Sequence, residues 1–181
     1  MMVEFRRKAN RLPEPSYEGR RAYFLTLCAQ RRKRLFSDAN LVTALIEALK
    51  KTCDEEAFAV HTYCFMPDHL HMILVGMGDS TIVSGVVRTF KGRATAQSRR
   101  LGITNLWQKG YYDHVIRSGE ALEQIAAYTV MNPVRAGLAR DFMDWPFSGS
   151  FVLEWKRLPP PAAPYVPPWK RRAGEEGSGS L

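Results

Sequence analysis

Hydrophobic and polar positions along the chain form two patterns, continuous apolar runs and apolar residues at helical spacing, which predict strands and helices respectively. Four runs rich in aliphatic, aromatic and β-branched residues predict strands at Ala22–Ala29, Phe58–Phe65, His69–Val75 and Tyr111–Arg117. Apolar residues at helical spacing predict three helices, at Asp38–Lys51, Thr81–Arg99 and Glu120–Met131. Asp38 or Asn40 is a candidate N-cap for the first helix. The predicted order is therefore βαββαβ followed by a helix.

This order indicates an α+β protein of ferredoxin-like topology, with a four-stranded antiparallel sheet and two helices on one face. Turn residues at Met66–Asp68 predict a hairpin between the second and third strands, and the last helix is expected to pack beside the sheet. We expect one domain over residues 1–157. Residues 158–181 predict a flexible tail, because six of the eleven prolines fall in its first half and Gly, Ser and Glu dominate its end.

Composition and charge narrow the classes of function. A chain of 181 residues with 45% hydrophobic content suits a single domain with a real core. Its 26 Lys and Arg against 18 Asp and Glu give a net charge of +8, which favours nucleic acid as a partner, although a merely soluble basic protein would share this balance. No membrane span and no leader sequence are evident, which predicts a cytoplasmic protein. The three cysteines form no CxxC pattern and are expected to be buried, reduced thiols.

Two histidines, His69 and His71, open the third predicted strand. On an extended strand, residues i and i+2 point to the same side, so both imidazoles would be presented together as half of a divalent-metal site. Two surface histidines on a half-exposed strand are the alternative interpretation.

Tyr128 and Asn132 form a second candidate pair near the end of the last predicted helix. Residues four apart lie one above the other on a helix, so these side chains can face one site. Structural roles are equally open at this point, because Tyr128 could be a core residue and Asn132 could cap the turn that starts at Pro133.

Three separated segments give the chain a specific resemblance. They are Met66–His71 (MPDHLH), Trp107–Arg117 (WQKGYYDHVIR) and Tyr128–Leu138 (YTVMNPVRAGL). In this order they resemble the REP-associated tyrosine transposases, which are single-tyrosine HUH transposases, over roughly Ala22 to Phe151.

This resemblance implies a nuclease domain that cuts and rejoins single-stranded DNA beside hairpin-forming palindromic repeats, through a 5′-phosphotyrosine. Carried over by position, His69 and His71 match the metal ligands, Tyr128 the nucleophile and Asn132 the third ligand. The insertion-sequence branch commonly has Gln at the position of Asn132. The family favours Mg or Mn as the divalent metal, and a metal would polarise the scissile phosphate for attack by a weakly nucleophilic phenol.

Basic side chains are the expected contacts to the DNA phosphates. The candidates for nucleic-acid binding are Arg20, Arg21, Arg31, Arg88, Lys91 and Arg93. A cationic stripe on a helix is also explained by solvation alone. His114 lies in a family segment but is left outside the catalytic set, since a structural role suits it equally. The alternative function is a non-catalytic DNA- or RNA-binding regulator of the same fold.

Overall fold

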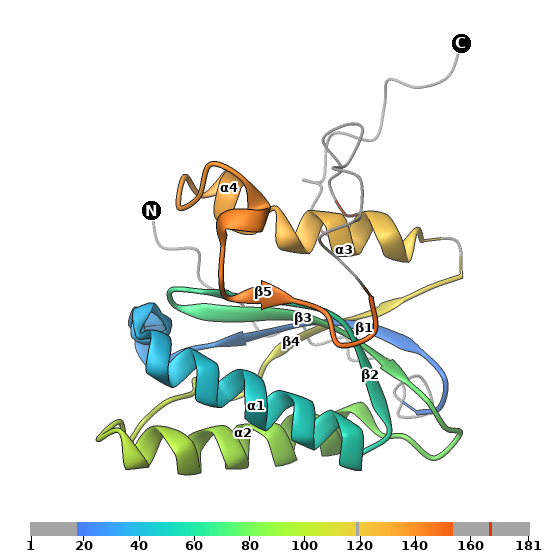
Figure 1. The fold of residues 1–181 in the computed structure, drawn as a ribbon. Helices are drawn as coiled ribbons and strands as arrows, with labels where there is room; N and C mark the ends of the chain where they lie inside the picture. Colours follow the sequence, from blue (N-terminus) through green and yellow to red (C-terminus); the bar gives the residue numbers. More distant parts are fainter. Residues whose placement is uncertain (1–17, 119, 154–166, 168–181) are drawn as a thin grey trace.

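The computed structural model describes residues 18–118, 120–153 and 167 of the chain. Its centre is a five-stranded antiparallel sheet in the order β4-β1-β3-β2-β5 (Figure 1). The strands are β1 Ala22–Cys28, β2 Phe58–Met66, β3 His69–Gly76, β4 Tyr112–Ile116 and β5 Ser148–Gly149. Apart from residue 167, the tail predicted at 158–181 lies outside the described residues.

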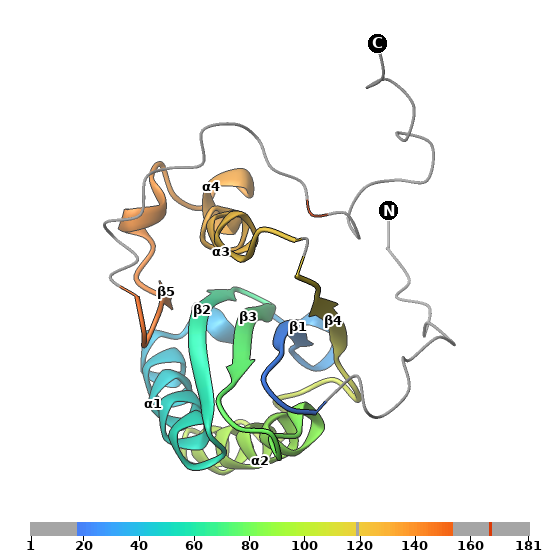
Figure 2. The same ribbon diagram turned by 90° about the vertical axis from the view of Figure 1, so that its right-hand side faces the viewer.

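Helices cover both faces of this sheet. They are α1 Ala39–Glu55, α2 Val83–Arg100, α3 Leu122–Val130 and α4 Asn132–Arg135, and the short 3-10 helices are η2 Gln30–Arg32, η3 Leu35–Ser37 and η4 Phe142–Asp144. α1 and α2 lie side by side on one face, and α3 and α4 lie over the opposite face (Figures 1 and 2). The predicted βαββαβ order and ferredoxin-like topology are confirmed. Among the described residues, none of the helices combines the length and apolar character needed to cross a membrane.

The main core lies between the sheet and the α1–α2 layer. Asp38 is the N-cap of α1, because its carboxylate accepts hydrogen bonds from the backbone N–H groups of Asn40 and Leu41. The predicted apolar face of α2 is fully buried against this core, through Val83, Val86, Val87, Phe90 and Ala94.

The number of strands and the end of the last helix differ from prediction. β5 adds a fifth strand beside β2, and its two residues are too few to produce an alternating pattern. The predicted helix Glu120–Met131 is shorter, and a second helix, α4, begins at Asn132. Pro133 has no N–H to donate to the carbonyl of Thr129, and the side-chain amide of Asn132 donates to that carbonyl instead, at 2.9 Å.

A bulge in β2 determines which of its side chains face α3. The pairing with β3 shifts between Val60 and Thr62, so that His61 is the extra residue. Because of this shift, Val60 and Tyr63 both belong to the core under α1 and α2. The side chains of Thr62 and Cys64, which alternate with Tyr63, consequently face the other layer.

Two glycines should respond in opposite directions to substitution by alanine. A Cβ on Gly76 would lie 2.2 Å from the carbonyl oxygen of Gly19 and 2.4 Å from Oγ1 of Thr81, and backbone must move to relieve this contact. We expect Gly76→Ala to lower the free energy of unfolding by about 1–3 kcal/mol. Gly92 lies inside α2 with open space around its Cβ position, so Gly92→Ala should raise it by about 0.5–1 kcal/mol. Urea unfolding of the two variants measures both values, and equal effects would contradict the packing at Gly76.

Candidate active site

The histidine pair lies on the sheet face that α3 covers. In β3 the side chains of His69, His71 and Ile73 share one face, because side chains alternate along a strand. Ile73 packs with Ile125 and Ala126 of α3 in the smaller apolar cluster of the protein. The intervening residues of β3 belong to the core on the other side of the sheet.

Both imidazoles are held by a hydrogen bond at Nδ1. His71 Nδ1 lies 2.8 Å from Oγ1 of Thr26 in β1, and His69 Nδ1 lies 2.6 Å from Oδ1 of Asp68. Phe24 stacks on the His71 ring, with 5.3 Å between centroids. With both Nδ1 atoms bonded, the two Nε2 atoms point toward each other at 3.0 Å. The structure therefore presents the two imidazoles together.

Asp68 links the histidine pair to the basic segment that follows β1. Its second oxygen pairs with Nη1 of Arg32 at 3.2 Å. Partial burial by itself raises the pKa of Asp68, but hydrogen bonding to His69 and the nearby charges of His69 and Arg32 lower it overall. The carboxylate therefore stays ionised at neutral pH and accepts a hydrogen bond from Nδ1–H of His69. In a neutral imidazole with its proton on Nδ1, the lone pair is on Nε2.

The convergence of the two Nε2 atoms fits a divalent cation. Metal-bound imidazoles characteristically use one ring nitrogen for the metal and the other for a hydrogen bond to a carboxylate, hydroxyl or carbonyl. In the part of the chain that the structure describes, the pair belongs to no group of three or more His, Cys, Asp or Glu side chains that could hold a metal ion. A cation at the pair would take its other ligands from groups such as a side-chain amide, the substrate or water.

Sulfur-bearing side chains flank the pair on the neighbouring strands. Cys64 in β2 is paired with His71 in the sheet register, and Cys28 in β1 is paired with His69. Burial raises the pKa of Cys64 to about 12, while the neighbouring Ser148 hydroxyl and the positive charge of Arg135 oppose this rise. All three cysteines are free thiols as predicted, although Cys28 is only half-buried.

Tyr128 lies half-buried on α3, the helix that rests against β2 and β3. The guanidinium carbon of Arg135 lies 3.8 Å from the centroid of the Tyr128 ring. Nη1 of the same guanidinium donates to the backbone carbonyl of Tyr128 at 2.8 Å. A cation over an aromatic face at an exposed site contributes roughly 0.5–1 kcal/mol. Burial lowers the pKa of Arg135, and its interactions with Tyr128 and Cys64 raise it in part.

Asn132 is connected to Tyr128 by Arg135, which contacts both residues. Its Oδ1 accepts a hydrogen bond from Nη2 of Arg135 at 2.7 Å, and its Nδ2 donates to the carbonyl of Thr129. The prediction that Tyr128 and Asn132 share one helix is wrong, because α3 ends at Val130 and Asn132 begins α4. An amide oxygen has two lone pairs, so the bond to Arg135 leaves Oδ1 one further ligand position.

His114 anchors the beginning of the tyrosine-bearing segment to the sheet. It lies in β4 opposite Phe24, and its Nε2 is 2.9 Å from a carboxylate oxygen of Glu120. Glu120 also accepts a hydrogen bond from the backbone N–H of Arg117. These contacts fasten the segment just before α3 to β4, which is a structural role for His114.

The three predicted phosphate contacts on α2 lie on the layer opposite the histidine pair. Arg88 is exposed there. Lys91 donates to the backbone carbonyls of Gln108 and Gly110, at 2.8 and 3.0 Å. Arg93 forms an ion pair with Glu55 of α1, and it also bonds to Thr52 of that helix. Lys91 and Arg93 therefore already hold parts of the fold together.

The other three predicted contacts lie at different ends of the sheet. Arg20 pairs with Asp79 at 3.4 Å, and Arg21 is exposed beside it in the sequence. Arg31 is exposed in η2 with a positive φ of 53°. The segment containing Arg31 lies beside the turn before His69, because the N–H of Ala29 donates to the carbonyl of Asp68 at 2.9 Å. Arg31 thus lies in a segment that a backbone hydrogen bond joins to the turn before His69.

Sequence reasoning did not identify three residues that organise the site. They are Thr26, which holds His71, Asp68, which holds His69, and Arg135, which contacts Tyr128 and Asn132. Asp68 and Arg135 lie inside the family segments, and the position of Asp68 directly before His69 was an available signal. Thr26 depends on the register between β1 and β3, which local pattern does not reveal.

A ferredoxin-like sheet with a histidine pair on the face covered by a tyrosine-bearing helix is the arrangement of a single-tyrosine HUH enzyme. Residues 20–131, more than half of the chain, match the model of the family described as "Transposase IS200 like". The chain belongs to this family of transposases. This confirms the class of enzyme that the sequence motifs predicted.

Similar proteins agree with this membership. A REP-associated tyrosine transposase of Escherichia coli (strain K12) is 26% identical over 119 residues, which cover 61% of this chain and 70% of that protein. A Haemophilus influenzae protein described as "Putative REP-associated tyrosine transposase" is 24% identical over 137 residues, which cover 70% of this chain and 77% of that protein. A solved structure of a REP-associated tyrosine transposase bound to a REP hairpin superposes with a TM-score of 0.63 and 26% identity, over 81% of this chain and 82% of that one.

Proposed function

We propose that this transposase cleaves and rejoins single-stranded DNA at hairpin-forming palindromic repeats, with Tyr128 as nucleophile and His69 and His71 as metal ligands. The observation that carries the proposal is the convergence of the two Nε2 atoms, with both Nδ1 atoms held by Thr26 and Asp68. Asn132 is the proposed third ligand, through the lone pair of Oδ1 that Arg135 does not use. A bound Mg²⁺ or Mn²⁺ supplies Lewis acidity to the scissile phosphate.

In the cleavage step, the hydroxyl oxygen of Tyr128 attacks the phosphorus and the bond from phosphorus to the 3′-oxygen breaks. The phenol loses its proton to solvent, and the departing 3′-oxygen takes up a proton to become a 3′-OH. Tyr128 is left joined to the 5′-phosphate. Because one phosphodiester replaces another, the step needs no ATP and a 3′-OH can reverse it, which suits strand rejoining.

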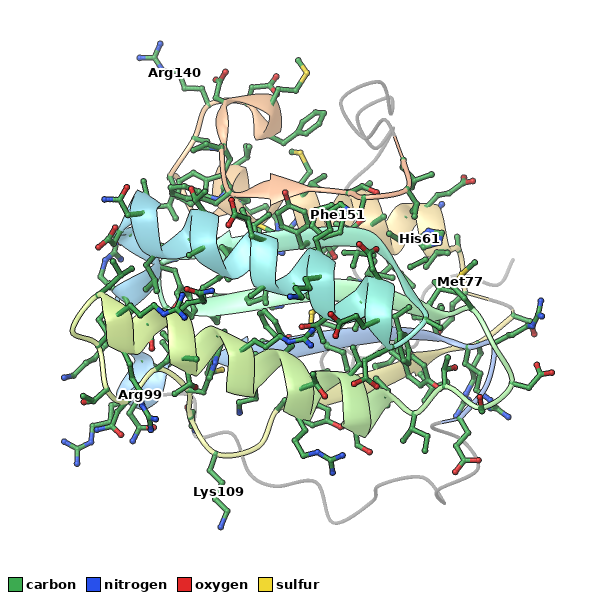
Figure 3. All side chains as sticks on the ribbon, turned by 60° about the horizontal axis from the view of Figure 1, so that its bottom comes forward. His61, Met77, Arg99, Lys109, Arg140 and Phe151 are labelled. Carbon is green, nitrogen blue, oxygen red and sulfur yellow. The ribbon has the colours of Figure 1, made fainter. Side chains whose placement is uncertain are left out.

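The proposed substrate is supported by a relative and by charge. The similar protein of solved structure is bound to a REP hairpin. In this chain, the loops at the His69 end of the sheet carry the exposed cations Arg31, Lys33, Arg34 and Lys109. Figure 3 shows the Lys109 side chain extending away from the body of the protein. Such side chains suit contacts to the phosphates of a DNA strand that enters the site. Of the six basic residues predicted to bind nucleic acid, Arg31 is the one that lies in these loops.

Covalent capture of DNA tests this function. The protein is incubated with end-labelled single strands carrying imperfect palindromes from its source genome, in Mn²⁺, in Mg²⁺ and in EDTA. We expect a denaturation-resistant protein–DNA adduct with either metal and none in EDTA, and mass spectrometry of the digested adduct should place the DNA on Tyr128. Cleavage without an adduct, an adduct on another residue, or no adduct on any repeat with either metal would contradict the proposal.

A further inference from the structure

Arg135 makes an unusual set of contacts for an exposed side chain. One guanidinium stacks on the ring of Tyr128, donates through Nη1 to the Tyr128 carbonyl, and donates through Nη2 to the amide oxygen of Asn132. The two nitrogens of one planar group thus bond to two residues while its central carbon lies over an aromatic ring. These contacts join α3 to α4 across the interruption that Pro133 imposes.

The helix that carries Arg135 packs on the strand next to the histidine pair. β2 is the neighbour of β3 in the sheet, and Cys64 of β2 is paired with His71. α4, which contains Arg135, rests against β2. Arg135 therefore belongs to a helix that packs against both the tyrosine-bearing helix and the strand beside His71.

We propose that Arg135 is a positioning residue for strand cleavage, which fixes the ring of Tyr128 and the amide oxygen of Asn132 relative to each other. This inference rests on the proposed function, because it assigns Arg135 a task only if Tyr128 attacks DNA. The task is geometric: a flat, forked group can stack on a ring and donate two divergent hydrogen bonds at once. A lysine ammonium keeps the positive charge but has neither the plane nor the fork.

Charge and geometry are separable with two substitutions at one position. Arg135→Lys keeps the charge and Arg135→Gln removes it, and both lose the forked contacts. We expect both variants to form the Tyr128 adduct about 10- to 100-fold more slowly at saturating hairpin DNA, as when the residue that orients a catalytic group is lost. The dissociation constant of Arg135→Lys for the same DNA, measured in EDTA by fluorescence anisotropy, should change by less than about twofold.

The matched control is Arg140→Gln. Arg140 is an exposed arginine in the loop after α4, and its side chain points away from the protein (Figure 3). This variant should cleave at the wild-type rate, and thermal melting of all three variants verifies that they are folded. A slow Arg135→Gln with a normal Arg135→Lys would show a role of charge alone and would overturn the proposal.

The two hypotheses fail in different ways. If the wild type forms an adduct that Tyr128→Phe does not, while both Arg135 variants react at the wild-type rate, the positioning role is wrong and the nucleophile stands. If Tyr128→Phe still forms the adduct, the proposed function itself is wrong.

Discussion

Tyr128→Phe is expected to abolish the covalent protein–DNA adduct and strand cleavage together. The substitution removes one oxygen atom and keeps the ring on which Arg135 stacks, so the local packing is preserved. Deleting the nucleophile of a covalent catalyst removes the reaction path itself, and we expect a loss of at least about 10⁴-fold in the cleavage rate. The rate is measured with labelled hairpin DNA in Mn²⁺, and the affinity for the same DNA is measured in EDTA. The affinity should stay within about twofold, because the phosphate contacts remain.

Tyr63→Phe is the matched control for this loss. Tyr63 is a buried tyrosine of β2 whose side chain lies on the other face of the sheet, in the core under α1 and α2. Burial raises the pKa of Tyr63, so its hydroxyl stays protonated and is a poor nucleophile. The control should cleave DNA at the wild-type rate. Residual cleavage by Tyr128→Phe through a water molecule, with no adduct, would show a hydrolytic nuclease in place of a strand transferase.

Much of the fold was predictable because its information is local. The apolar and β-branched runs of β1, β3 and β4 and the helical spacing in α2 specify elements that tertiary packing then retains. The turn residues at Pro67–Asp68 predicted that β2 pairs with β3, and Asp38 as a candidate N-cap predicted where α1 begins. The juxtaposition of His69 and His71 follows from the period of a strand alone, which is why the sequence indicated half of a metal site.

The rest of the site depends on contacts between distant segments. Thr26 reaches His71 only because β1 pairs with β3 in one register, and one residue of slip would turn its side chain to the other face. The bulge at His61 likewise decides that Cys64 faces α3. The role of Arg135 depends on the break between α3 and α4, where Pro133 interrupts a helix that periodicity alone had extended through Tyr128 toward Asn132.

The predicted nucleic-acid contacts were difficult for a different reason. A sequence gives the number of positive charges but does not show where each of them lies on the folded protein. Lys91 and Arg93 are cations of an amphipathic helix, and the structure uses both to fasten neighbouring segments. Arg31 has the same formal charge but lies in the loop beside the turn before His69. Only the three-dimensional arrangement separates a cation that is bonded to neighbouring segments from one that is exposed beside the histidine pair.

His71→Ala is expected to cause the second large loss, in metal affinity and in cleavage at once. His71 is 6% exposed and contributes one of the two converging Nε2 atoms, so its removal leaves His69 as a single imidazole. Lewis-acid stabilisation of a phosphoryl oxygen is worth several kcal/mol, and each 1.4 kcal/mol is tenfold in rate, which predicts a loss on the order of 10³-fold. Cleavage rates over a Mn²⁺ titration and calorimetric Mn²⁺ binding give the two quantities.

A graded series separates the ligand from its support. Thr26→Val keeps the imidazole of His71 but removes the hydroxyl bonded to its Nδ1, so metal affinity should fall about 10- to 100-fold, less than for His71→Ala. His61→Ala removes a histidine at the β2 bulge, away from the converging pair, and should leave Mn²⁺ affinity unchanged. If His71→Ala bound Mn²⁺ as the wild type does, the histidine pair would not be the metal site. The expected loss of Mn²⁺ affinity is therefore largest for His71→Ala, smaller for Thr26→Val and absent for His61→Ala. The intermediate value for Thr26→Val reflects the hydrogen bond that turns Nε2 of His71 toward His69.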